Sequence, residues 1–161
     1  MTRSITKVVI GLVGLWLATL GGTRPATAQT IDVAVVVNSQ NPVDNVSASE
    51  LRKIFVGEKR SWASGTPIRL FVRAPGAHER TVLLKLLNMS ESEYKQYWTA
   101  RVFRGEAQAE PVALFSNGMQ KEAIGIYPGA VVLMNVQDVK PGMKIVRPEG
   151  HKPGESGYLL H

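Results

Sequence analysis

The stretch IRLFVRAPGAHERTVLLKLL, residues 68–87, decides the fold of this chain. It opens on a short apolar run, which is typical of a buried strand, and Pro75 and Gly76 then interrupt that strand. Apolar residues recur at helical spacing over residues 82–87, so a helix is expected to begin near Ala77. In an open α/β sheet, ligands collect where strands end and helix N-termini present unpaired N–H groups. The sequence therefore predicts an anion site at Arg73.

The first 28 residues have the three-part pattern of a secretory signal peptide. Arg3 and Lys7 precede an apolar core over residues 8–20, and Ala26-Thr27-Ala28 forms an Ala-x-Ala cleavage site. The predicted organisation is a signal peptide over residues 1–28, cut after Ala28, and one domain over residues 29–161 that is periplasmic or secreted. An uncleaved N-terminal anchor is the alternative, but the apolar run is short for a membrane span. No membrane insertion is expected after cleavage.

Net charge and cysteine content argue against a nucleic-acid-binding protein and against a disulfide-stabilised one. The predicted signal peptide holds three basic residues and no acidic ones, so its removal lowers the formal net charge from +6 to +3. No dense basic stripe with interleaved aromatic residues remains, and we expect no nucleic-acid partner. The chain has no cysteine, so stability must come from packing rather than from disulfides.

The rest of the chain alternates strand and helix patterns. Residues 31–37 (IDVAVVV) are almost continuously apolar, as expected of a strand buried on both faces of a parallel sheet. Residues 130–134 are another buried-strand candidate, and residues 111–115 form a short apolar segment. Helices are expected after Ser47, with Glu50 completing a capping box, after Ser90, with Glu93 completing a second one, and after Ser116. This alternation predicts an α/β fold with a single doubly wound sheet.

Two aromatic features allow either a ligand-binding or a structural interpretation. Trp62 lies in a polar connection, where it could stack on a ligand or fold over the core as a plug. Tyr94, Tyr97 and Trp98 follow one another on one face of a predicted helix, where they could line a binding site or pack in the core. Helical spacing alone accounts for this row of aromatic residues, so core packing is the simpler interpretation.

The order of motifs in the predicted domain resembles that of short phosphate ABC transporter substrate-binding proteins. The motifs are VVVNSQNPV (35–43), SELRKIFVGEKRSWASGTPI (49–68), YWTARVFRG (97–105), YPGAVVLM (127–134) and EGHKPGESGYLL (149–160), together with the loop at Arg73. The resemblance implies a single lobe of a type 2 periplasmic binding protein that binds phosphate or a similar oxyanion for an ABC-type uptake system. It also implies an ABC permease or another envelope protein as partner, no enzymatic activity and no cofactor.

Carried over residue by residue, the anion-holding arginine of this family falls on Arg73 and the loop glycine on Gly76. The family's Ser-Gly-Thr run falls on Ala77, His78 and Glu79, where the pattern is lost. Ala77 removes a hydroxyl donor, and Glu79 places a carboxylate where the anion would lie.

The candidate ligand-binding residues are Arg73, Gly76, Ala77, His78, Arg80, and Asn38 with Ser39 from the end of the first strand. Arg73, His78 and Arg80 could form a cationic patch. The histidines are scattered, no paired metal-ligand spacing occurs, and the Gly154-Glu155-Ser156-Gly157 turn lacks the spacing of a nucleophile elbow, so neither a metal site nor catalysis is predicted.

The altered loop leaves two hypotheses open. The first is a solute-binding protein for an oxyanion. The second is a single lobe that has lost its ligand and docks on another envelope protein or on itself.

Overall fold

The computed structural model describes residues 31–161, so the predicted signal peptide and its cut after Ala28 lie outside the described residues. The strands are β1 (Val33–Asn38), β2 (Asn45–Val46), β3 (Arg69–Arg73), β4 (Val112–Leu114), β5 (Ala130–Asn135) and β6 (Met143–Pro148). The helices are α1 (Ala48–Phe55), α2 (His78–Leu87), α3 (Glu91–Phe103), α4 (Asn117–Ile126) and a short 3-10 turn (Val136–Asp138). Together they form one mixed sheet of six strands, in the order β2-β6-β1-β5-β3-β4, with helices around it.

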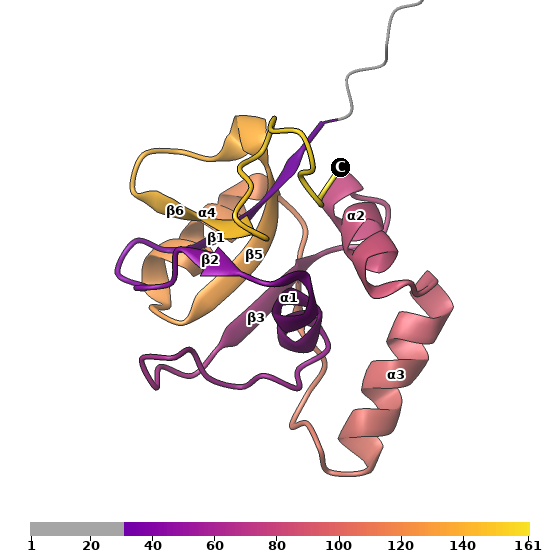
Figure 1. Ribbon diagram of the computed structural model, residues 1–161. Coiled ribbons are helices and arrows are strands. Elements are labelled where there is room, and N and C mark those ends of the chain that lie inside the picture. Colours follow the sequence, from indigo (N-terminus) through magenta and orange to yellow (C-terminus); the bar gives the residue numbers. More distant parts are fainter. Residues whose placement is uncertain (1–30) are drawn as a thin grey trace, which may run out of the picture.

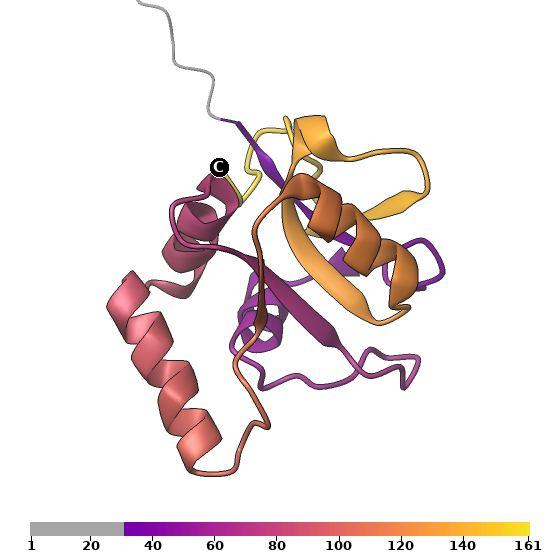
Figure 2. The ribbon, with the colours of Figure 1, turned by 180° about the vertical axis from the view of Figure 1, so that it is seen from behind.

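Helices cover both faces of the sheet, as the alternating sequence pattern predicted. Helices α1 and α2 lie on one face and α3 extends beyond α2 (Figure 1), whereas α4 crosses the opposite face (Figure 2). Two apolar clusters follow from this arrangement. One joins α1, α2 and α3 to the sheet, and the other lies beneath α4. Among residues 31–161, no helix is long and apolar enough to cross a membrane.

The direction of β1 differs from the prediction. All six of its residues are buried, as expected, but β1 runs antiparallel to both of its neighbours, β5 and β6. The expectation of a parallel sheet around this strand is therefore wrong. A strand covered on both faces is continuously apolar whichever way its neighbours run, so the valine run carries information on burial and none on direction.

The predicted helix starts are confirmed by their caps. The Ser47 hydroxyl accepts the Glu50 amide, Ser90 and Glu93 form a reciprocal capping box, and the Ser116 hydroxyl accepts the Met119 amide. These side chains satisfy N–H groups that the first turn of a helix leaves without partners. The predicted capping box at Ser47 is only half formed, because the Glu50 carboxylate pairs with Lys59 instead of bonding back to the Ser47 amide.

The structural interpretation of the aromatic residues is confirmed. Trp62 is 3% exposed, and its indole N–H donates to the Gly129 carbonyl at 3.1 Å, so it closes the core as a plug. Tyr94 and Trp98 are buried in the cluster around α3, and Tyr97 packs at its border.

Candidate functional site

The carboxyl ends of β3, β4 and β5 meet at one edge of the sheet. Strand β3 runs parallel to both β4 and β5, with Arg73 opposite Leu114 at the end of β4. Strand β1 begins at this same edge, where Val33 pairs with Asn135 at the end of β5. Helices α2 and α4 also begin here, directly after β3 and β4. The edge therefore has the geometry that the sequence predicted around Arg73.

Arg73 has internal partners at this edge. Its Nη1 donates to the Leu114 carbonyl at 3.3 Å, and the same carbonyl accepts the Ala74 amide at 3.0 Å. Its Nε lies 3.5 Å from Oε1 of Glu79, whose side chain is 2% exposed. Within residues 31–161, neither Arg73 Nε nor Glu79 Oε1 has a hydrogen-bond partner. A buried carboxylate thus lies against the guanidinium that was predicted to hold an anion.

The start of α2 leaves backbone donors free. Ala77 is the N-cap and offers no side-chain acceptor, while its own amide donates back to the Ala74 carbonyl. The amides of His78 and Glu79 make no hydrogen bond to another described residue. Gly76, at φ +88°, takes the left-handed conformation that this tight turn requires. The first turn of α2 consequently presents two unpaired N–H groups, as predicted.

The cationic patch predicted from Arg73, His78 and Arg80 does not form. Nε2 of His78 lies 2.8 Å from the Ile31 carbonyl, so the imidazole is engaged with the chain that leads into β1. Arg80 is 6% exposed and donates through Nε and Nη2 to Glu91, at 3.0 Å and 2.5 Å. It connects α2 to α3 instead of facing the edge of the sheet.

The environment of Arg80 also changes the acidity of its neighbours. Its hydrogen bonds hold the pKa of Glu91 below the usual value for a glutamate. Its guanidinium lies 4.2 Å from the ring centre of Tyr94, and burial raises the pKa of that phenol to about 12. Sequence spacing did not reveal this cluster, because the Arg80–Glu91 pair spans the turn between two helices.

Asn38 and Ser39 lie at the end of the sheet opposite Arg73, because β1 runs antiparallel to β5. The prediction that they join the Arg73 site is therefore wrong. It assumed that β1 runs parallel to its neighbours, which would have put the end of β1 at the Arg73 edge. The Asn38 amide group donates to the Ile124 carbonyl at 2.7 Å, and its oxygen accepts the Gln40 amide at 2.9 Å. Asn38 thus anchors α4 and shapes a turn.

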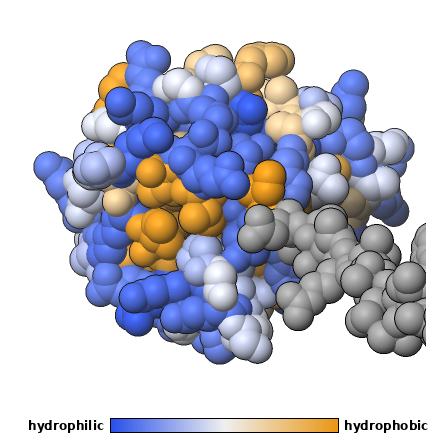
Figure 3. Space-filling model, turned by 90° about the horizontal axis from the view of Figure 1, so that it is seen from above, coloured by the Kyte–Doolittle hydropathy of each residue, from blue (hydrophilic) through white to orange (hydrophobic). Residues whose placement is uncertain are grey.

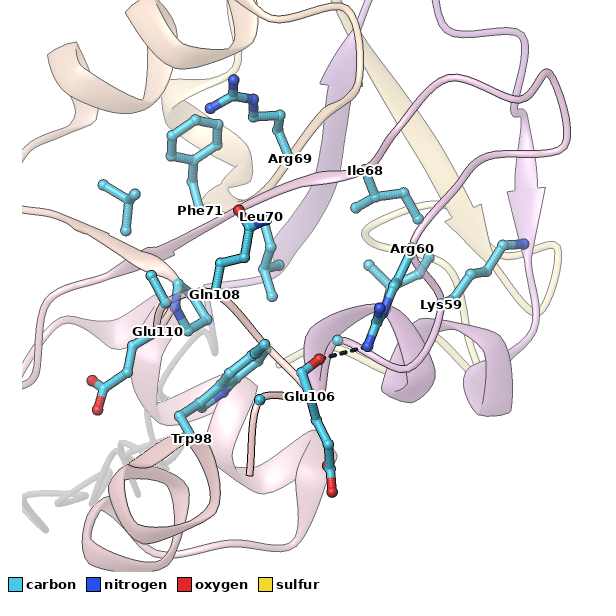
Figure 4. A pocket seen from close by; sticks show the side chains of 17 residues that line it. Lys59, Arg60, Ile68, Arg69, Leu70, Phe71, Trp98, Glu106, Gln108 and Glu110 are labelled. Atoms are coloured by element: carbon cyan, nitrogen blue, oxygen red, sulfur yellow. Dashed lines mark hydrogen bonds between the residues drawn. The ribbon is translucent and has the colours of Figure 1, made fainter. Parts of the chain in front are cut away.

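A pocket of about 590 Å³ lies away from this edge, between β3, the ends of α1 and α3, and residues 105–112. Figure 4 shows Trp98 forming one wall and Arg60 reaching the Glu106 carbonyl, a hydrogen bond of 2.5 Å. The lining mixes cationic and acidic side chains, and it includes none of the predicted site residues. In the part of the chain that the structure describes, no group of three or more His, Cys, Asp or Glu side chains could hold a metal ion.

A six-stranded α/β lobe with helix N-termini and an arginine at one sheet edge has the form of a solute-binding lobe. The sequence matches the PBP superfamily domain family over residues 23–149, so the chain belongs to this family. The predicted resemblance to phosphate-transporter-type binding proteins, and the single-lobe fold that it implied, are thereby confirmed.

Solved structures with the same fold are binding proteins. An ABC-type phosphate transport receptor from Vibrio cholerae matches with a TM-score of 0.62 and 21% identity, over 76% of this chain and 48% of its own. A phosphate ABC transporter substrate-binding protein with bound phosphate from Clostridium perfringens matches with a TM-score of 0.62 and 15% identity, over 76% and 46%. PstS from Borrelia burgdorferi matches with a TM-score of 0.57 and 14% identity, over 76% and 49%. The aligned part amounts to about half the length of each of these proteins.

Proposed function

We propose that this chain is a solute-binding module for a small oxyanion, with phosphate as the first candidate. The ligand would lie at the carboxyl edge of β3, β4 and β5, against Arg73 and the free amides of His78 and Glu79. Gly76 and Ala77 shape the turn that places these amides, and His78 borders the site. Arg80 is left out of this proposal because it pairs with Glu91, and Asn38 and Ser39 are left out because they lie at the opposite end of the sheet.

One observation carries the proposal: the edge already holds an anionic group. The Glu79 carboxylate lies 3.5 Å from Arg73 Nε, within the first turn of α2. Guanidinium, unpaired amides and the positive end of the helix macrodipole are the elements that attract negative charge. Two of the matched structures described above are named for phosphate transport, and one contains phosphate, which supports phosphate as the first candidate.

The export route and the partner follow from the same proposal. A signal peptide cut after Ala28 would deliver the domain to the periplasm or the outside, and an ABC permease would take up the released solute. N-terminal sequencing of the exported protein should begin at Gln29. A protein that keeps residues 1–28 in the envelope would contradict the cleavage.

Titration calorimetry of the purified protein with inorganic phosphate and with sulfate tests the binding function. We expect saturable binding of phosphate by the native protein and its loss in the Arg73→Met variant, which retains the side-chain stem but not the charge. Arg147→Met, at an exposed position of β6, is the matched control and should bind as the native protein does. If Arg73→Met binds phosphate unchanged, the site lies elsewhere.

A second candidate function is docking on another protein, and the apolar surface at the same edge favours it. Phe115, which follows β4, is 74% exposed, Met119 in the first turn of α4 is 39% exposed, and Ile31 is 41% exposed. Figure 3 looks onto this end of the molecule, where apolar surface gathers in one area ringed by hydrophilic residues, next to the grey segment. Exposed apolar patches of this kind mark contact surfaces.

Cross-linking in intact cells tests docking. A photoreactive residue at position 115 should capture a partner protein, and one at Lys121 on α4 should capture much less. Equal capture from both positions would show that the apolar edge has no special role in contacts.

A further inference from the structure

The contact between Glu79 and Arg73 is looser than an ordinary ion pair of buried groups. Charge-assisted N–H···O bonds are about 2.7–2.9 Å long, whereas Nε and Oε1 lie 3.5 Å apart here. Both atoms are buried and have no hydrogen-bond partner within residues 31–161. The two charges therefore neutralise each other without satisfying each other's hydrogen bonds.

The pairing of Glu79 with Arg73 is weaker than that of a fully hydrogen-bonded ion pair. A buried charge needs both a countercharge and hydrogen bonds to offset its desolvation. Glu79 has the countercharge and the macrodipole of α2, since it lies in the first helical turn. It lacks the hydrogen bond on Oε1 that would fix it in place. The pair is therefore held less firmly than one in which both hydrogen bonds are made.

We infer that Glu79 is an internal competitor of the solute: its carboxylate occupies Arg73 in the free protein and must leave before an oxyanion can bind. This inference rests on the proposed function. A tetrahedral oxyanion offers several acceptor oxygens, so it can bond to the Arg73 guanidinium and to the free amides of His78 and Glu79 together. The Glu79 carboxylate would repel it, because like charges placed side by side cost several kcal/mol.

Competition between the Glu79 carboxylate and the oxyanion for Arg73 would lower the affinity of the site for the oxyanion. When only a fraction of the molecules has Arg73 free, the apparent dissociation constant is the intrinsic one divided by that fraction. Removing the Glu79 charge frees Arg73 and also removes the repulsion. We therefore expect Glu79→Gln to tighten phosphate binding by about tenfold or more. Glu122→Gln, which removes a carboxylate from the exposed side of α4, should change the affinity little.

Two measurements on the full protein test the inference. Calorimetry with inorganic phosphate at fixed ionic strength compares the native protein, Glu79→Gln and Glu122→Gln. Hydrogen exchange of the Arg73 Nε–H group, followed by ¹⁵N NMR without ligand, reports whether Glu79 shields that group. We expect tighter binding and faster exchange in Glu79→Gln only. If Glu79→Gln does not fold, Glu79→Asp, which withdraws the carboxylate by one methylene, should show a smaller change in the same direction.

The outcomes separate the inference from the function on which it rests. If the native protein and Glu79→Gln bind phosphate with equal affinity, the competition is refuted and the binding function stands. If neither binds phosphate while Arg73 exchanges faster in Glu79→Gln, the pairing is real, but the proposed function fails and the inference fails with it.

Discussion

The Arg80→Lys substitution tests whether Arg80 is a structural connection between α2 and α3. The native guanidinium makes two bonds to Glu91 and lies 4.2 Å from the ring centre of Tyr94. Lysine keeps the charge but cannot form the forked pair. Losing one charge-assisted hydrogen bond to Glu91, whose side chain is 44% exposed, should cost about 1 kcal/mol, and the weaker stacking on Tyr94 about 0.5–1 kcal/mol. We expect a total loss of about 2 kcal/mol.

Urea unfolding followed by tryptophan fluorescence measures this loss as a lower midpoint at an unchanged slope. Arg80 lowers the pKa of Glu91 in the folded state, so the stability that this pair contributes is fully present above the ordinary pKa of 4.5 and is lost as the pH falls through the lowered value. The difference between native protein and variant should therefore be constant near neutral pH and shrink below about pH 4.5.

The matched control is Arg147→Lys, at an exposed position, which should leave the midpoint unchanged. Phosphate binding should survive Arg80→Lys, since Arg80 faces α3. A variant as stable as the native protein but unable to bind phosphate would refute the assignment and restore Arg80 to the ligand site.

Three further substitutions test other contacts. Gly129→Ala would place a Cβ 1.9 Å from the Pro67 carbonyl, so we expect a loss of about 3 kcal/mol or more in urea unfolding, whereas Gly125→Ala, which meets open space on α4, should be neutral or stabilising. Trp62→Phe leaves the Gly129 carbonyl without its indole donor and should lower the melting temperature, corresponding to a loss of about 1–2 kcal/mol. A double-mutant cycle of Arg73→Met and Glu79→Gln in unfolding experiments should give a coupling energy of about 1–3 kcal/mol, and additive losses would contradict the pairing.

Local signals in the sequence were sufficient for most elements of the fold. Capping at Ser90 and Ser116 and the break at Pro75 and Gly76 each depend on residues close together in the chain, and the structure has all of them. Strand direction is different, because it depends on which strands become neighbours. The short β2 escaped prediction because two residues carry no periodic pattern.

The misplacement of Asn38 and Ser39 in the site is a consequence of strand direction. If β1 ran parallel to β5, its end would lie at the same edge of the sheet as Arg73, whereas in the observed sheet the start of β1 lies at that edge. The sequence therefore predicted the local geometry of one continuous stretch, in which Arg73 ends β3 and α2 begins directly after the loop. Contacts from other segments, such as Leu114 and Ile31, become visible only once the topology is known.

Glu79 illustrates a further limit of the sequence. A carboxylate in the first turn of a helix is stabilised by the macrodipole, and that same field attracts a solute anion, so the residue type is compatible with an empty site, an altered site or an internally occupied one. The structure favours internal occupation, because Glu79 is 2% exposed and lies against Arg73 rather than in solvent. Yet the 3.5 Å separation and the unsatisfied atoms on both side chains leave the pair less stable than a bonded one. Within the proposed function, this means that the chain's own carboxylate takes the place of the anion at Arg73 until an oxyanion displaces it.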